Sequence, residues 1–163
     1  KADEALKESK QRFEDLANLL PQPIWESDLQ GRLIYLNKAG RQIFGISEQQ
    51  LNEDFYFHNI FPEQYKSQVD TLFSGKLKKL SMPLEMECRN AFGELFPVLV
   101  YTNLSHIHEH SNSIRGIILD VSNLKKVENE LLSLSTLQKV LIKIPLNISM
   151  LPSIKLTSQS TLP

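Results

Sequence analysis

The sequence predicts an α+β domain built on an antiparallel sheet and flanked at both ends by amphipathic helices. Three observations carry this prediction. Strand-like apolar patterns fall into two groups joined by hairpins, helical patterns lie between the groups, and seven-residue apolar spacing marks both ends of the chain. Hairpin-linked strands with helices grouped between them are typical of α+β domains.

The composition is that of an ordinary globular protein, with 163 residues, 41% of them hydrophobic and 23% charged. A net charge of −1 gives no field to hold nucleic acid or an anionic membrane, so we expect neither as a partner. The single cysteine, Cys88, excludes an internal disulfide and favours a cytoplasmic location. The chain starts inside a charged helical pattern without a methionine, so we expect it to be a fragment of a longer protein.

Residues 1–20 are predicted to form a linker helix that also dimerises the chain. Apolar residues recur every seven positions on one stripe, at Leu6, Phe13 and Leu20, while the other faces are charged. A dimer seam accounts for the narrow stripe. The alternative is a single amphipathic helix packed on its own domain. Pro21 ends the helix because proline offers no backbone N–H.

A hairpin and three helical segments follow. Two apolar segments flank the four-residue connection Asp28–Gly31, which has aspartate and glycine at its ends. Residues 38–45 show helical spacing and end on a glycine, which is a common helix stop. Ser47 is a capping residue for another turn, and Pro62 opens a longer helix that Gly75 closes.

Three further strands complete the predicted sheet. In residues 82–89 apolar and charged residues alternate, so we expect a strand with one buried face and one solvent-exposed face. Asn90–Gly93 forms a turn, and residues 94–107 return as a long strand. The polar segment 108–113 is predicted to be a loop, and the final strand begins at Arg115.

The final strand runs into the last helix with almost no connection between them. Only Asp120, Ser122 and Asn123 separate the two apolar patterns, and all three residue types cap helices. Residues 124–144 are predicted to form a coiled coil with Gln138 as its polar member. Its apolar seam consists of Leu124, Val127, Leu131, Leu134 and Leu141. The alternative is a helix that covers its own sheet.

Four local patterns resemble the PAS domain, the sensory module of bacterial and archaeal signalling proteins. They are WESDLQGRLIYLN, FGIS followed by EQQL, RNAFGELFPV and GIILDVSNLKKVENEL, and together they span about residues 12–134. Asn37 matches the strand-ending asparagine of the family, and Asp120 opens a match to its closing aspartate signature. Phe92 stands where many relatives carry aspartate before the turn glycine.

The resemblance implies a five-stranded antiparallel sheet in the order 2-1-5-4-3, with short helices folded over one face to enclose a pocket. It also implies a homodimer and an exit helix that regulates a downstream output domain, such as a histidine kinase. Signal transmission is then expected at Asp120, Ser122 and Leu124, with Arg115 or Arg32 as the basic partner of Asp120. A hypothesis of another class is a ligand-free dimerisation scaffold.

Large side chains predicted to lie on the inner face of the sheet form a candidate ligand pocket, with Asn103 and Arg89 as polar contacts. These candidates are Trp25, Tyr35, Phe44, Met86 and Tyr101. A binding pocket needs a few convergent polar groups within apolar walls, so plain core packing is the alternative for each of them.

We expect no cofactor, or an unknown small ligand. Flavin photosensors of the resembled family carry a reactive cysteine in a helix, whereas Cys88 lies on a predicted strand. Haem-binding relatives use a histidine on the long middle helix, which has none here. His106, His108 and His110 could share a strand face and bind zinc or nickel, but they run into a polar loop, so we expect no metal site.

No glycine-rich phosphate loop, pair of metal-binding carboxylates or nucleophile–base motif occurs, so we expect no catalysis by this chain. The exit helix contains no histidine, so a histidine kinase activity would belong to the parent protein.

The predicted organisation is a helix over 1–20, a PAS-like domain over 21–123, a signalling helix over 124–144 and an irregular tail over 145–163. The tail has three prolines, no periodicity and almost no charge, so it cannot continue the coiled coil. Two interpretations remain open for it: a disordered linker, or residues translated out of frame.

Overall fold

The computed structural model describes residues 2–74, 83–108 and 111–144, and for residues 106–108 and 111 it describes the backbone alone. One antiparallel sheet of five strands in the order β2-β1-β5-β4-β3 dominates the fold, which confirms the expected topology. The strands are β1 (Ile24–Ser27), β2 (Leu33–Leu36), β3 (Leu84–Arg89), β4 (Leu95–His108) and β5 (Ser111–Asp120).

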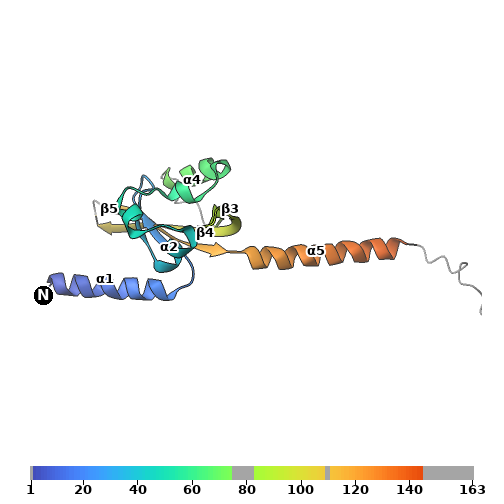
Figure 1. Cartoon of the computed structure of the whole chain (residues 1–163), viewed down its shortest axis with the longest axis horizontal. Helices are drawn as coiled ribbons and strands as arrows, with labels where there is room; N and C mark the ends of the chain where they lie inside the picture. Colours follow the sequence, from blue (N-terminus) through green and yellow to red (C-terminus); the bar gives the residue numbers. More distant parts are fainter. Residues whose placement is uncertain (1, 75–82, 109–110, 145–163) are drawn as a thin grey trace, which may run out of the picture. The chain divides into compact units, whose positions relative to one another are not determined.

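Short helices fill the stretch between β2 and β3, and Figure 1 shows two of them, α2 and α4, beside the sheet. Local signals set their ends: Ser47 forms a capping box with Gln50, and Gly45 ends α2 with a φ of 67°. The elements are α2 (Lys38–Phe44), α3 (Glu48–Asn52), the 3₁₀ turns η1 (Phe57–Ile60) and η2 (Glu63–Tyr65), and α4 (Lys66–Phe73).

Two predicted boundaries are wrong. The helix expected from Pro62 is divided into a 3₁₀ turn and α4, with Pro62 in an extended conformation before them. The loop expected over residues 108–113 is largely strand, because β4 reaches His108 and β5 starts at Ser111. The pairing of β4 and β5 continues through polar residues because their backbones form hydrogen bonds, as the register of His106 with Asn112 shows, so no apolar pattern marks this part of the strands. Gly75, the predicted helix stop, and residues 109–110 lie outside the described residues.

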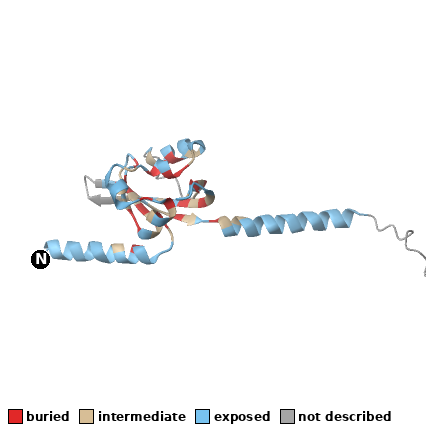
Figure 2. Cartoon of the chain, viewed as in Figure 1, coloured by how far each residue is buried: buried red, intermediate tan, exposed pale blue. Residues whose placement is uncertain are grey.

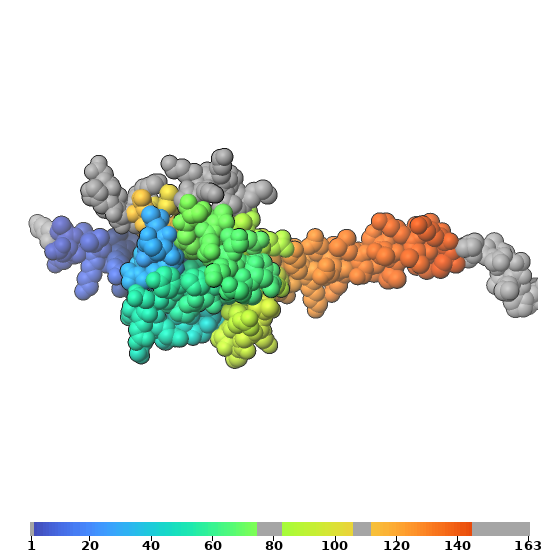
Figure 3. All heavy atoms as spheres, turned by 90° about the horizontal axis from the view of Figure 1, so that it is seen from above, coloured from blue at the N-terminus to red at the C-terminus, as the bar shows by residue number. Residues whose placement is uncertain are grey.

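The core lies between one face of the sheet and the short helices, where Figure 2 shows most of the buried residues. The Trp25 ring from β1 stacks on Phe57 from η1, with ring centroids 3.9 Å apart. Val69 and Leu72 of α4 are fully buried against the same cluster. In Figure 3 residues from about 48 to 73, coloured teal to green, form a continuous layer of side chains.

Gly116 in the middle of β5 allows Trp25 to pack flat on the sheet. A Cβ atom at this position would lie 2.8 Å from two carbons of the Trp25 ring and would collide with the carbonyl oxygen of Tyr101. Glycine normally weakens a strand, but here its missing side chain makes room for the largest residue of the core.

The two longest helices precede and follow the strands in the sequence: α1 (Ala2–Leu19) and α5 (Ser122–Lys143). The chain divides into two compact units, Lys1–Lys126 and Val127–Pro163, so most of α5 belongs to a different unit from the sheet. Within the described ranges, no helix combines the length and apolarity required to cross a membrane. The tail over 145–163 lies outside the described residues, so both interpretations of it stay open.

Candidate functional site

The junction between β5 and α5 joins strand to helix through a single residue, Val121. Its N–H donates to the carbonyl of Pro97 in β4, at 3.0 Å, and its own carbonyl accepts from the N–H of Lys125 in α5, at 2.9 Å. Val121 is also buried. One residue therefore carries a bond to the sheet and a bond of the first helical turn, and the connection contains no flexible loop.

The side chain of Asp120 binds the start of α5. Its Oδ1 accepts a hydrogen bond from the backbone N–H of Ser122, at 2.8 Å. This amide is one of those that a helix start leaves without an intrahelical partner. A carboxylate at this end also interacts favourably with the helix dipole. The capping geometry expected of Asp120 is therefore present.

The expected pairing of Asp120 with an arginine is wrong within the described part of the chain. Arg115 forms an ion pair with Glu26, at 3.2 Å, and Arg32 binds two other carboxylates. Arg115 is five residues from Asp120 along one strand, so the two side chains lie on opposite faces. Arg32 follows the β1–β2 turn, which lies beyond the Ile114 end of β5, far from Asp120.

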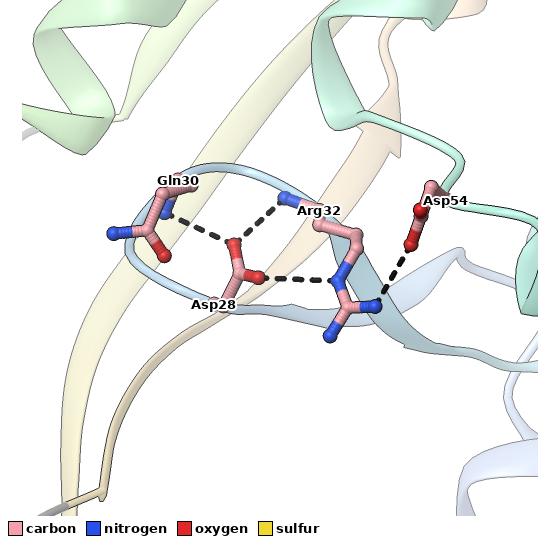
Figure 4. Close-up of polar contacts among 4 residues, drawn as sticks. All are labelled: Asp28, Gln30, Arg32 and Asp54. Atoms are coloured by element: carbon pink, nitrogen blue, oxygen red, sulfur yellow. Dashed lines mark hydrogen bonds and ion pairs between the residues drawn. The ribbon is translucent and has the colours of Figure 1, made fainter.

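Arg32 ties two loops together, as Figure 4 shows. Its Nη1 lies 2.8 Å from Oδ1 of Asp54, and its Nε lies 3.3 Å from Oδ2 of Asp28. The other oxygen of Asp28 accepts from the N–H groups of Gln30 and Arg32, which fixes the hairpin turn. Hydrogen bonds to Asp54 and then to Asp28 raise the pKa of Arg32 above its ordinary value. The carboxylates of Asp28 and Asp54 both bind Arg32, so the cluster holds the two loops together.

The predicted seam of α5 is exposed. No residue of this helix is buried. The exposed fractions of the predicted seam are 64% for Leu124, 53% for Val127, 62% for Leu131, 59% for Leu134 and 66% for Leu141. An apolar stripe of this length, exposed to water along a helix, needs a partner surface.

α1 is held to the sheet near its C-terminal end. Ala17 is buried, and the ring of Phe13 lies 5.5 Å from the ring of Tyr35 in β2. Leu6, nearer the N-terminus, is 70% exposed, and Leu20 is also exposed. The predicted dimer stripe is therefore divided: Phe13 contacts its own domain, while Leu6 and Leu20 remain free of it.

Asn37 joins α1, β1 and α2 through one buried amide. Its Oδ1 accepts from the N–H groups of Ile24 and Gly40, both at 3.0 Å. Its Nδ2 donates to the carbonyls of Ala17, at 2.8 Å, and Gln22, at 2.9 Å. The sequence marks Asn37 only as a strand-ending residue, because partners 13 to 20 residues away leave no local pattern.

The six predicted pocket residues do not converge. Trp25, Phe44 and Met86 lie in the core between sheet and helices. The expectation that the others face this core is wrong, because they lie on the opposite face of the sheet. These are Tyr35, Tyr101 and Asn103, whose strand partners are Glu26, Ile117 and Arg115. Side chains alternate along a strand, so inward-facing neighbours of Tyr101 force it outward.

The core contains few polar groups with which to recognise a ligand. Trp25 Nε1 and Ser27 Oγ are buried without a hydrogen-bond partner. Arg89, a predicted polar contact, is exposed and donates instead to the carbonyl of Gly93, at 3.1 Å. Trp25, Phe57 and Met86 are at most 2% exposed, so the described side chains of the core pack closely against one another.

Cys88 is fully buried, which confirms its interpretation as a small core residue. Burial raises the pKa of its thiol far above the ordinary value, so it is not a reactive thiolate. Of the predicted histidines, His110 lies outside the described residues, as do the side chains of His106 and His108. Among the described residues, no cluster of histidine, cysteine and carboxylate side chains could hold a metal.

Comparisons with known proteins agree with this topology. Residues 11–74 match a family model described as PAS domain. No curated protein matches the chain at a significant level. The PAS domain of a protein from Colwellia psychrerythraea is 16% identical with a TM-score of 0.60, and the match covers 70% of this chain and 97% of that one.

Two further solved structures share the fold. The PAS domain of an HTR-like protein from Haloarcula marismortui is 19% identical with a TM-score of 0.58, over 73% of this chain and 97% of that one. A sensory box histidine kinase/response regulator from Burkholderia thailandensis is 16% identical with a TM-score of 0.54, over 78% and 98%.

Proposed function

We propose, from the match of residues 11–74 to a PAS family model and from the shared fold, that this chain is a sensory module that detects a small molecule or a protein partner. The module passes its signal through α5 to a downstream output domain, a histidine kinase or a similar effector. The similarity to a solved sensory box histidine kinase/response regulator supports this class of output. The chain itself contributes detection and transmission, and catalysis belongs to the parent protein.

The observation that carries the proposal is the direct join at Val121. Because this residue bonds to β4 and to the first turn of α5, a displacement of the sheet moves the start of the helix with it. A flexible loop would absorb such a displacement. Packed elements tend to switch between discrete arrangements, so a small change in the domain can become a change in helix position.

We further propose that the chain forms a homodimer through α5. The exposed seam from Leu124 to Leu141 has the spacing of a coiled coil, and pairing with a second copy would bury it. Two exposed leucines, Leu6 of α1 and Leu20 directly after it, offer a second contact. A change in pairing would then reach the output domain of both chains.

Asp120→Ala in the parent protein tests the proposal. The variant loses the bond to the Ser122 amide, and the loss of a helix cap lowers the free energy of unfolding by about 0.5–2 kcal/mol. We expect the output activity to shift as well. Ser47→Ala is the matched control because it removes the cap of α3, away from the junction. If both variants lose the same stability and both keep a normal output, Asp120 is only a helix cap and has no role in signal transmission.

A ligand-free dimerisation scaffold is the second candidate, and the densely packed core favours it. Trp25, Phe57 and Leu72 are at most 1% exposed, so these side chains of the described core pack closely. Mass spectrometry of the native protein separates the two candidates. A retained small molecule supports the sensor, and an empty protein whose output ignores every added ligand supports the scaffold.

A further inference from the structure

A cleft of about 300 Å³ lies where α2, the β3–β4 turn (residues 90–94) and the end of β5 meet. Ile43 of α2, Phe92 of the turn and Phe96 of β4 form its apolar walls, and Asp120 of β5 supplies a charged group. In the register of β4 and β5, Asp120 and Phe96 lie on one face of the sheet. The cleft therefore adjoins the junction at which α5 begins.

The ring of Phe92 is not needed for the fold of its own turn. Oδ1 of Asn90 accepts from the N–H groups of Phe92 and Glu94, both at 2.9 Å, and Gly93 has a φ of 82°. These features require no particular side chain at position 92. Phe92 is nevertheless 89% exposed, more than any other large apolar side chain of the described residues. Aromatic side chains are enriched in protein interfaces, so the exposed ring points to a protein partner.

One oxygen of the Asp120 carboxylate is left for that partner. Oδ1 accepts from the N–H of Ser122, whereas within the described parts of the chain no hydrogen bond or ion pair involves Oδ2. The Asp120 residue is exposed, so a group in the cleft can reach it. A carboxylate oxygen beside apolar walls favours a cation, because hydrogen bonds between ionised groups are the strong ones.

The β3–β4 turn carries a matching cation. Nη1 of Arg89, the last residue of β3, donates to the carbonyl of Gly93, at 3.1 Å, which holds the guanidinium against the turn that bears Phe92. Arg89 is exposed and forms no ion pair with a described residue. The turn therefore presents an apolar ring and a cation, and the cleft presents apolar walls and an anion.

We propose that the cleft receives the β3–β4 turn of a second copy of this chain. Phe92 of the second copy would pack against Ile43 and Phe96, and Arg89 of the second copy would bind Asp120. The contact is reciprocal, since each copy offers both a turn and a cleft, as an isologous two-fold interface requires. The complementary charges fix the orientation of the two copies.

The inference rests on the proposed homodimer and extends it from α5 to the sheet domain. Asp120 precedes Leu124, the first residue of the seam, by four residues, so the contact adjoins the proposed helix pairing. The tests below measure association alone. A failure here therefore leaves the join at Val121, which carries the signalling proposal, untouched.

Sedimentation equilibrium of the 163-residue chain and its variants tests the contact. Phe92→Ser removes the ring and should raise the dissociation constant of the dimer at least tenfold. Leu29→Ser is the matched control, because it changes an exposed apolar residue between β1 and β2, and it should leave the constant unchanged. Phe92 lies outside the core, so its replacement should keep the melting temperature, which separates lost pairing from lost folding.

A double-variant cycle tests the ion pair. Arg89→Gln and Asp120→Asn each remove one charge, and the asparagine can still accept the N–H of Ser122. Each single variant should raise the dissociation constant about threefold or more. The double variant should be no weaker than the weaker single variant, because the two changes break the same contact.

These results together support the contact. An unchanged constant in Phe92→Ser, an equal loss in Leu29→Ser, charge effects that multiply independently, or a chain that stays monomeric overturns it. If Leu131→Lys weakens the dimer and Phe92→Ser does not, the copies pair through α5 and the turn is not part of the interface.

Discussion

At the scale of single residues, buried polar and reactive groups decide how the elements are held together. Asn37 satisfies four backbone groups with one side-chain amide, and it does so at the point where α1, β1 and α2 meet. The Cys88 thiol, by contrast, has only apolar surroundings, and burial alone sets its pKa. Each of these two residues supports a prediction about stability.

Asn37→Ala should lower the free energy of unfolding by about 2–4 kcal/mol, because it leaves buried backbone donors and acceptors without partners. Urea denaturation measures the loss. Asn18→Ala is the control, since Asn18 makes one exposed bond to the Lys38 amide, worth about 1 kcal/mol. Similar small losses for both variants would contradict the joining role of Asn37.

Stability should fall as the pH rises above about 8.5, the ordinary pKa of a cysteine thiol. In the folded protein burial raises the pKa of Cys88, so only the unfolded chain releases the proton in this range. The unfolded state is therefore favoured by up to about 1.4 kcal/mol per pH unit. Denaturation at pH values from 7 to 10 measures the slope, and Cys88→Ala should lose this component. An equal decline in both proteins would contradict the assignment to Cys88.

At the scale of elements, the sequence predicts helices and strands well where nearby residues determine them. Ser47 and Gly45 mark helix ends because their bonds reach only a few residues along the chain. Patterns fail where a distant partner decides. The β4–β5 ribbon extends through polar residues because their backbones pair, and η1 forms where Phe57 meets Trp25.

The candidate site could be predicted only in part, for the same reason. The strand-to-helix junction at Asp120 is a local pattern, and its cap is present. Residue type alone does not decide which face of the sheet a side chain occupies, and the strand pairing places Tyr101 and Asn103 on the face opposite the core. The buried Asn37 amide joins α1, β1 and α2 through partners 13 to 20 residues away, which no local spacing in the sequence reveals.

Leu131→Lys should weaken the dimer, because it would place a charge in the apolar seam of α5. Sedimentation equilibrium of the variant should show a dissociation constant raised at least tenfold. Ser133→Lys is the control, since it adds the same charge to the same helix outside the seam. A monomeric unmodified protein at high concentration would contradict the proposed pairing.

At the scale of the whole molecule, the chain combines a five-stranded antiparallel sheet, in a domain that a PAS family model matches over residues 11–74, with a long exposed helix that begins one residue after the last strand. In the proposed mechanism, this helix is rigid and pairs with the same helix of a second copy, and the signal passes along it. Its orientation about its own axis then matters to whatever follows it. An α-helix turns by about 100° per residue, so inserted residues rotate everything downstream by a known angle.

The most direct test of the account is therefore the output activity of the parent protein with four or seven helix-forming residues inserted after Ser133. Seven residues preserve the heptad seam, whereas four rotate it out of register. Transmission through α5 predicts an altered output for the four-residue insertion and an output near that of the unmodified protein for the seven-residue one. Equal outputs from all three proteins would contradict transmission through α5.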